Sequence, residues 1–246
     1  MQAAENAMKR CFKGLTDTGV VRNVNQDHYS VDPEGRFFIV ADGMGGHAGG
    51  EEASQIATEV ITDYLNQQWN SDYSSENLLI AALEKANEAI LADQQTHPER
   101  ADMGTTVVAV LFRQQQPWYG HIGDSRLYQL RGKKLRQITE DHTWVAKALK
   151  AGDITTEQAK SHPWRHVLSQ CLGRKEIEKI EVKTLDVQLG DRLLLCSDGL
   201  TEEVSDENIA HYLHESATCE DAAKGLVELA KKNGGSDNIT VVIIEE

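Results

Sequence analysis

Aspartates beside small residues recur at the ends of apolar segments along this chain. Four such segments read VADGMGG, HIGDSR, LLLCSDGL and GGSDNITV, and a fifth, VRNVNQDHY, carries Arg22 and Asp27. A single Asp-Gly pair after a strand is usually an ordinary turn, so no one segment is informative alone. Asp42 and Asp198, however, both follow an apolar strand directly and both precede glycine. A carboxylate at the end of a buried strand is held rigidly, as a metal ligand must be.

The chemistry that such carboxylates support is the binding of hard divalent cations. Mg²⁺ and Mn²⁺ take oxygen ligands in octahedral geometry and keep several waters. The set has no Cys or His pair at zinc spacing, which disfavours zinc. Two cations about 3.5–4 Å apart can share a water, lower its pKa and hold a phosphoryl group in line with it. The aspartate count alone would also allow a calcium site, but no EF-hand spacing is present.

The overall charge narrows the class of partner. Lys and Arg number 25 against 39 Asp and Glu, a formal net charge of -14. Phosphate backbones bind basic surfaces, so we expect no nucleic acid partner. A phosphoprotein substrate is itself anionic, and bound cations could invert the local field at the site. Otherwise the excess charge simply keeps the protein soluble.

The remaining composition is that of an ordinary globular protein. Of 246 residues, 40% are apolar and 26% are charged. No apolar run approaches the roughly 20 residues of a membrane span, and the first residues lack the apolar region of a secretory signal. None of the four cysteines belongs to a CxxC pair. We therefore expect no membrane association, a cytoplasmic location and reduced thiols.

The elements that must position the aspartates mix strands and helices. Residues 37–43 predict a strand, and 50–68 and 74–95 predict helices, the second capped by Ser74 or Ser75. Closely spaced strands at 105–112, 118–123, 126–130 and 134–139 favour antiparallel hairpins. Strands within 181–199, helices at 206–214 and 219–233 and a last strand at 238–246 follow. Residues 141–173 are rich in charge and His, as in a lid inserted on the sheet scaffold.

These segments together resemble a known family. VRNVNQD, FFIVADGMGGHAGGEEAS, ADMGTTVVAV, HIGDSRLY, DHTW, LLLCSDGLTE and GGSDNITVVII occur in order from about Gly14 to the C-terminus. They resemble the metal-dependent protein phosphatase family of type 2C in its bacterial form, and SHPWRHVLSQCLGR is most similar to cyanobacterial members. The resemblance implies an α+β fold, a four-layer α-β-β-α sandwich of two antiparallel sheets flanked by helices. It also implies one catalytic domain over residues 1–246, with a flap at about 143–172.

The resemblance implies a role for each metal-site residue. Asp42 would bridge two Mg²⁺ or Mn²⁺ ions, and the carbonyl of Gly43 would bind the second. Asp198 and Asp237 would complete the first, and Asp27 would bind directly or through water. Bacterial members often hold a third ion, for which Asp124 and Asp198 are the expected ligands. Asn238 would orient waters or the ligand.

The resemblance also implies a reaction. A metal-bridging hydroxide attacks the phosphoserine or phosphothreonine phosphorus, while Arg22 holds the phosphate oxygens. No phosphoenzyme forms, so Cys196 should be dispensable. Met44 stands where eukaryotic members usually have a His that protonates the leaving group. His47 could replace it, could merely pack or bind water, or a metal-bound water could be the acid.

The flap is expected to recognise the substrate. We expect Trp164 to be packed, with Arg165 and His166 nearer the substrate. The expected substrates are phosphoserine and phosphothreonine proteins in signal transduction, by analogy the PII nitrogen regulator, and the expected enzyme is a monomer. A degenerate, non-catalytic binding module is disfavoured because Arg22 and the metal carboxylates are present. A metallohydrolase acting on other phosphoesters is the remaining alternative, with nucleic acid excluded by the acidic balance.

Overall fold

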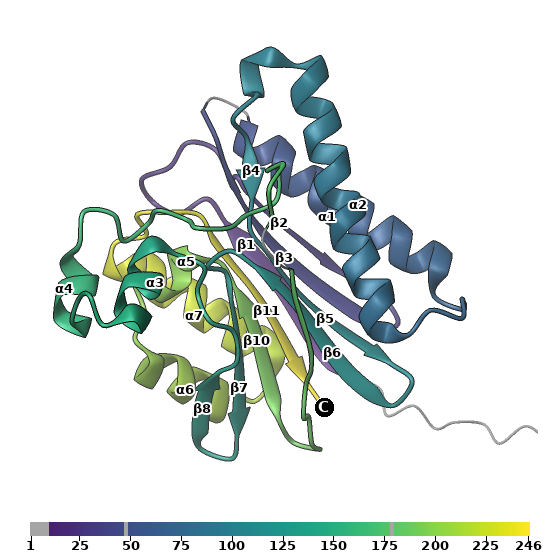
Figure 1. Cartoon of the computed structure of the whole chain (residues 1–246). Coiled ribbons are helices and arrows are strands. Elements are labelled where there is room, and N and C mark those ends of the chain that lie inside the picture. The colour runs from purple at the N-terminus through teal and green to yellow at the C-terminus, as the bar shows by residue number, and fades with distance from the viewer. Residues whose placement is uncertain (1–9, 47–48, 178–179) are drawn as a thin grey trace, which may run out of the picture.

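Two antiparallel β-sheets lie face to face in this protein, with helices on both outer sides (Figure 1). The computed structural model describes residues 10–46, 49–177 and 180–246. The first sheet contains, in spatial order, β1 (Cys11–Asp17), β11 (Ile239–Glu245), β10 (Arg192–Cys196), β7 (Arg126–Arg131) and β8 (Lys134–Gln137). The second contains β2 (Asp27–Val31), β3 (Phe37–Met44), β5 (Val107–Arg113), β6 (Gln116–Ile122) and β9 (Glu181–Thr184), and β4 (Gly104–Thr105) pairs with β3.

Successive side chains of the central strands pack alternately into two hydrophobic cores, one on each face of the sheet. In β3, Phe38 and Val40 pack between the sheets, whereas Phe37, Ile39 and Ala41 pack beneath the outer helices. Successive side chains of a strand point to opposite faces, so a strand buried on both faces must be apolar throughout. This explains why the run FFIVA shows no polar alternation.

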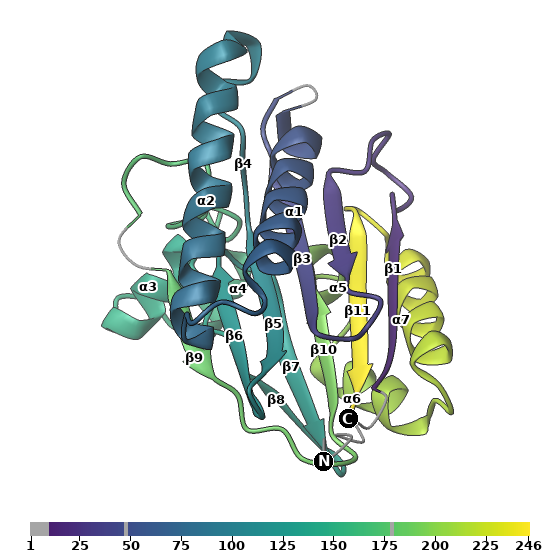
Figure 2. The same cartoon turned by 90° about the vertical axis from the view of Figure 1, so that its right-hand side faces the viewer.

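The outer helices divide between the two sheets (Figures 1 and 2). α1 (Gly49–Gln68) and α2 (Ser75–Thr96) cover the second sheet, and the short 3₁₀ helix Pro98–Arg100 leads to β4. α5 (Asp198–Thr201), α6 (Asp206–Glu215) and α7 (Cys219–Asn233) cover the first sheet. Ser74 caps α2, as its hydroxyl accepts from the backbone N–H of Asn77. Within the described residues, no helix combines the length and apolar character needed to cross a membrane.

The flap carries two short helices, α3 (Trp144–Ala151) and α4 (Thr156–Ser161), at one side of the sandwich (Figure 1). Isolated bridges join Thr143 to Leu168 and Thr105 to Leu172, so the flap leaves and returns at the same edge. The expectation that Trp164 is packed is wrong. Trp164 is 53% exposed, and its ring stands edge-on to those of Trp144 and His162.

Candidate metal centre

The predicted aspartates meet at one end of the sandwich, because both sheets are antiparallel. Asp42 lies near the end of β3 and is opposite Asp27, the first residue of the paired strand β2. Asp198 follows the end of β10, and Asp237 precedes the start of its neighbour β11. Asp124 lies in the turn between β6 and β7. Five carboxylates spread over more than 200 residues of sequence are thus brought to one end of the fold.

A cavity of about 260 Å³ lies among them. Its lining comprises Arg22, Gln26, Asp42, Gly43, Met44, Gly45, Thr106, Asp124, His166, Leu168, Asp198, Asp237 and Asn238. Asp27 lies outside this lining and is only 3% exposed. Arg165, expected at the substrate, lines an adjoining cavity instead. His47, the expected proton donor, lies outside the described residues.

The carboxylates destabilise one another's charged forms. The pKa of Asp42 is raised well above its usual range by burial and then by its acidic neighbours, Asp27 first. Burial also raises the pKa of Asp27, to about 7. The pKa values of Asp124 and Asp198 are raised by burial and next by a nearby aspartate charge. So concentrated a negative charge is relieved by cations.

The donor set fits hard divalent cations. Ser197 donates its hydroxyl to Asp27 Oδ2 over 2.6 Å, while Asp27 Oδ1 is buried without a hydrogen-bond partner. A buried carboxylate oxygen normally has a partner, so Oδ1 suits a cation or a water bound to one. Cys196, the nearest thiol in sequence, packs in the core under α6 and α7, and burial raises its pKa to about 12. The available ligands are therefore oxygens.

Asp42 is fixed by two threonines of the adjacent strand segment. Its backbone N–H donates to Thr106 Oγ1 over 3.0 Å, and its carbonyl accepts from Thr106 N and from Thr105 Oγ1. Thr106 Oγ1 lies 2.6 Å from Ser125 Oγ, next to Asp124. The backbones of two expected ligands are thus joined through buried hydroxyls, which preorganises the site.

The glycines after Asp42 and Asp198 are required by close backbone contact. A Cβ on Gly43 would overlap the carbonyl oxygen of Gly50 and lie 2.6 Å from that of Gln26. A Cβ on Gly199 would overlap the carbonyl oxygen of Asn238. Neither glycine has the left-handed φ of a turn glycine. Both Asp-Gly pairs are therefore places where two backbones cross, which the turn interpretation of each pair does not predict.

Arg22 and Asn238 connect the first loop to the last strand. Arg22 Nη2 donates to Asp237 Oδ2 over 2.7 Å. Asn238 Oδ1 accepts from Gln26 N over 2.8 Å, and its Nδ2 donates to the carbonyls of Thr18 and Val24. The amide of Asn238 thus fastens the loop that carries Arg22. Its expected role in orienting waters or the ligand stays a prediction.

Comparison with known proteins decides the family. The model of the family described as protein phosphatase 2C matches residues 20–232. The chain belongs to the protein phosphatase 2C family. Its expected family and sandwich fold are confirmed, whereas a closer similarity to cyanobacterial members stays a prediction.

The relatives are bacterial enzymes. Serine/threonine protein phosphatase PstP of Mycobacterium tuberculosis is 41% identical over 234 residues, 95% of this chain but 44% of PstP, so the chain spans less than half of that relative. Protein phosphatase PhpP of Streptococcus pneumoniae is 37% identical over 235 residues, 94% of this chain and 95% of PhpP.

Solved structures agree with this assignment. A crystal structure of mycobacterial PstP superposes with a TM-score of 0.89 at 38% identity, over 96% of this chain and 98% of that one. A second structure, described as the PstP catalytic domain in complex with two manganese ions, superposes with a TM-score of 0.84 at 36% identity. The match covers 96% of this chain and 97% of that one. For the region that the chain shares with these structures, the expected enzyme class, a metal-dependent phosphoprotein phosphatase, is confirmed.

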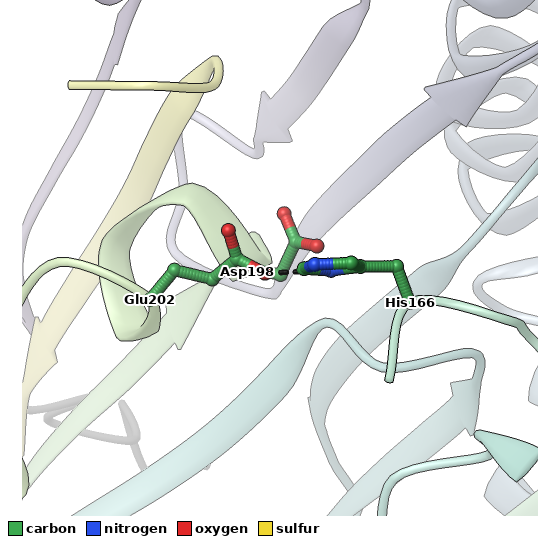
Figure 3. A group of neighbouring side chains, drawn as sticks. All are labelled: His166, Asp198 and Glu202. Carbon is green, nitrogen blue, oxygen red and sulfur yellow. Dashed lines mark ion pairs between the residues drawn. The ribbon is translucent and has the colours of Figure 1, made fainter. Parts of the chain in front are cut away.

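Glu202 is a residue of the site that the sequence motifs did not single out. His166 Nδ1 of the flap lies 2.7 Å from Glu202 Oε1, and both side chains converge on Asp198 (Figure 3). One ligand atom from each of these three residues lies within 4.8 Å of the others. Burial, and then the charges of Asp198 and Asp237, raise the pKa of Glu202 to about 7. Its position four residues after Asp198, one helical turn on, was the available signal.

Proposed function

We propose that this chain hydrolyses phosphoserine and phosphothreonine on proteins by direct attack of hydroxide on phosphorus, without a phosphoenzyme. The observation that carries the proposal is the convergence of four carboxylates and one guanidinium on a single cavity of about 260 Å³. The similar bacterial proteins that bear serine/threonine phosphatase names support the choice of substrate class. A purely binding role would not require this concentration of buried acids.

The proposed metal ligands are those that the family resemblance implies, and the convergence of the carboxylates on one cavity supports them. Asp42, at the centre, would bridge two Mg²⁺ or Mn²⁺ ions, with the carbonyl of Gly43 on the second. Asp198 and Asp237 would complete the first, and Asp27 would bind through its unpartnered oxygen or through water. Asp124 and Asp198 would hold a third ion. When bound, the cations lower the pKa of a shared water and offset the charge of the phosphoryl group.

Arg22 would hold the phosphate. Its side chain is 51% exposed and lines the cavity beside Asp237. A guanidinium matches two phosphate oxygens at once, and it stabilises the charge that builds on them during attack. On the flap, His166 lines the same cavity and Arg165 the adjoining one, so we assign both to the substrate. The role of His47 as proton donor stays a prediction.

The absence of a phosphoenzyme is supported by the side chains present. Within the described residues, the cavity lining contains no Ser or Cys. Its one hydroxyl, that of Thr106, is engaged by Asp42 N and Ser125. The thiol of Cys196 is fully buried, and its pKa of about 12 keeps it protonated at neutral pH. A phosphoenzyme would require one of these hydroxyl or thiol groups to be released, whereas direct attack of hydroxide on phosphorus does not.

The cellular setting completes the proposal. We assign the chain to the cytoplasm as a monomer, with phosphorylated signalling proteins as substrates and a PII-like regulator as one candidate. We also assign residues 1–246 to one catalytic domain, since one core packs between the two sheets. The supporting observations are the acidic composition and the sequence resemblance.

The deciding experiment compares a phosphoserine peptide with a phosphotyrosine peptide, each assayed with Mn²⁺, with Mg²⁺ and with chelator. We expect hydrolysis of phosphoserine that depends on the metal and exceeds that of phosphotyrosine. Asp42→Asn should abolish turnover, whereas Asp72→Asn, on the exposed turn between α1 and α2, should not. Activity that survives chelation in the wild type would overturn the proposal.

A further inference from the structure

A second cavity, of about 300 Å³, lies between the flap and the body of the protein. It shares Asp124, His166 and Asp198 with the lining of the catalytic cavity, so the two are contiguous. α3 contributes Val145 and Leu149 to its wall. The second cavity therefore lies within reach of residues next to a phosphorylated residue bound in the first.

The cavity is not apolar throughout, because the flap adds two cations, Lys160 at the end of α4 and Arg165 after it. Neither forms an ion pair with any described residue. The charge of Arg165 opposes the rise in the pKa of Glu202, but the two side chains form no direct salt bridge. In a chain of net charge -14, two unpaired cations beside the catalytic cavity are a specific feature.

The acids of this cavity are already engaged. Asp141 accepts from Arg126 Nε and Nη2 over 2.6 to 3.2 Å. Glu202 pairs with His166 over 2.7 Å. Asp124 and Asp198 lie on the wall shared with the catalytic cavity, where cations are proposed to bind. The cations of this lining that have no acidic partner among the described residues are therefore the two flap residues.

We propose that this cavity is a subsite for an acidic side chain, best a glutamate, close to the phosphorylated residue of the substrate. The inference rests on the proposed phosphatase function. The aliphatic stem of glutamate would pack on Val145 and Leu149, and its carboxylate would reach Lys160 and Arg165. Extended chains advance about 3.3–3.6 Å per residue, so contiguous cavities place the glutamate roughly one to three residues from the phosphoserine.

The test uses phosphoserine peptides that carry Glu, Ala or Lys in turn at each of the three positions on either side. We expect kcat/KM to be about tenfold higher for Glu than for Lys at one position, which corresponds to about 1.4 kcal/mol. In Lys160→Glu and in Arg165→Glu this ratio should fall to about one or invert. Lys175→Glu, an exposed lysine outside the cavity lining, is the matched charge control and should keep the wild-type ratio.

The outcomes separate the subsite from the proposed function. A wild-type enzyme without preference for Glu at any position overturns the subsite, and so does a preference that both flap variants retain. Wild-type hydrolysis of a small aryl phosphate, which cannot reach the second cavity, reports on the phosphatase alone. If that hydrolysis is absent or resists chelator, the proposed function fails instead.

Discussion

Arg22 Nη2 lies 2.7 Å from Asp237 Oδ2, so the residue assigned to the substrate phosphate is paired with one assigned to a metal ion. The pair is partly exposed, with 51% of the Arg22 side chain accessible, and such pairs contribute little stability. A cation that binds Asp237 competes with Arg22 for the same carboxylate oxygen. Metal binding should therefore release the guanidinium for the phosphate.

Replacing Arg22 tests this exchange. We expect Arg22→Ala to lower kcat/KM for a phosphoserine peptide by about 100-fold, in line with about 2–3 kcal/mol for charge-assisted hydrogen bonds. The Mn²⁺ concentration for half-maximal activity should stay equal or fall, because a competitor for Asp237 is lost. Arg22→Lys should be intermediate, since an ammonium lacks the planar fork. A raised Mn²⁺ requirement with unchanged KM would show that Arg22 only supports Asp237.

The close approach at Gly43 can be tested by adding one methyl group. Gly43→Ala should cost more than about 2 kcal/mol of unfolding free energy, because the Cβ meets backbone that cannot yield. It should also displace the expected metal-binding carbonyl and so weaken Mn²⁺ binding. Gly46→Ala is the control, since nothing lies within 4 Å of its added Cβ. Urea unfolding and Mn²⁺ titration measure both effects, and equal stability of the two variants would contradict the account.

His142, in the DHTW segment, holds the turn that carries Asp124. Its Nδ1 accepts from Gly123 N over 3.1 Å, and its own N–H donates to Gly123 O over 2.8 Å. We expect His142→Ala to raise the Mn²⁺ concentration for half-maximal activity about tenfold, as is typical when supporting residues of metal sites are lost. His142→Asn, whose amide oxygen can accept from Gly123 N, should show a smaller increase in the Mn²⁺ concentration for half-maximal activity than His142→Ala. A lower kcat at saturating Mn²⁺ with an unchanged midpoint would instead indicate a general structural defect.

Buried His121 should make stability fall in acid. Burial, and then the adjacent His142 ring, lowers its pKa to about 4, against a smaller opposing effect of Glu181 and Asp141. In the unfolded chain His121 binds a proton below about pH 6.5, whereas in the folded state it does so only below about pH 4. The contribution of neutral His121 to stability is therefore complete above pH 6.5 and is lost as the pH falls from 6.5 to 4. From pH 7.5 to pH 5 this group should cost roughly 2 kcal/mol.

The comparison with His121→Phe isolates this group from the aspartates, which also titrate. Urea unfolding of both proteins in chelator at pH 7.5 and pH 5 gives the difference in slope. The variant should lose less stability on acidification than the wild type. Identical losses would mean that His121 is protonated in the folded state or reaches water.

Cys196 should be dispensable for turnover. Its side chain is fully buried under α6 and α7, two residues before Asp198. Cys196→Ala and Cys196→Ser should keep kcat/KM within about twofold at saturating Mn²⁺ while losing about 1–2 kcal/mol of stability. A folded, Mn²⁺-binding variant without turnover would point to a thiol in the reaction.

The positions of the metal carboxylates were most predictable where they follow a run of apolar residues, because such a run predicts a buried strand. Asp42 and Asp198 were the clearest cases. The reason for their glycines was not predictable. Gly43 and Gly199 are constrained by the carbonyls of Gly50 and Asn238, and that crossing exists only after the sheets have assembled. Local sequence carries turn propensity but no information on such contacts.

The flap was the part least open to prediction. Its composition indicated a lid, yet Trp164 is exposed because the flap stacks its aromatic side chains on its own surface. Glu202 was missed for a different reason. Its spacing from Asp198 is a weak signal by itself, and its place in the site depends on His166, which the flap brings to 2.7 Å from Glu202 Oε1. The outer helices were predicted nearly to the residue, since α1, α2, α6 and α7 begin and end within one residue of the predicted ranges.

The placement of β11 has a consequence for how the protein becomes active during synthesis. This strand lies between β1 and β10, and Asp237 and Asn238 lead directly into it. A ribosome that has not yet released residues 237–245 holds a chain whose first strand has no partner within the sheet and whose Arg22 loop is unfastened. α1 can pack on α2 and on β3 earlier, because these contacts join segments that are close in sequence. The proposed site is therefore completed only after residues 237–245 have been synthesised and β11 has paired with β1.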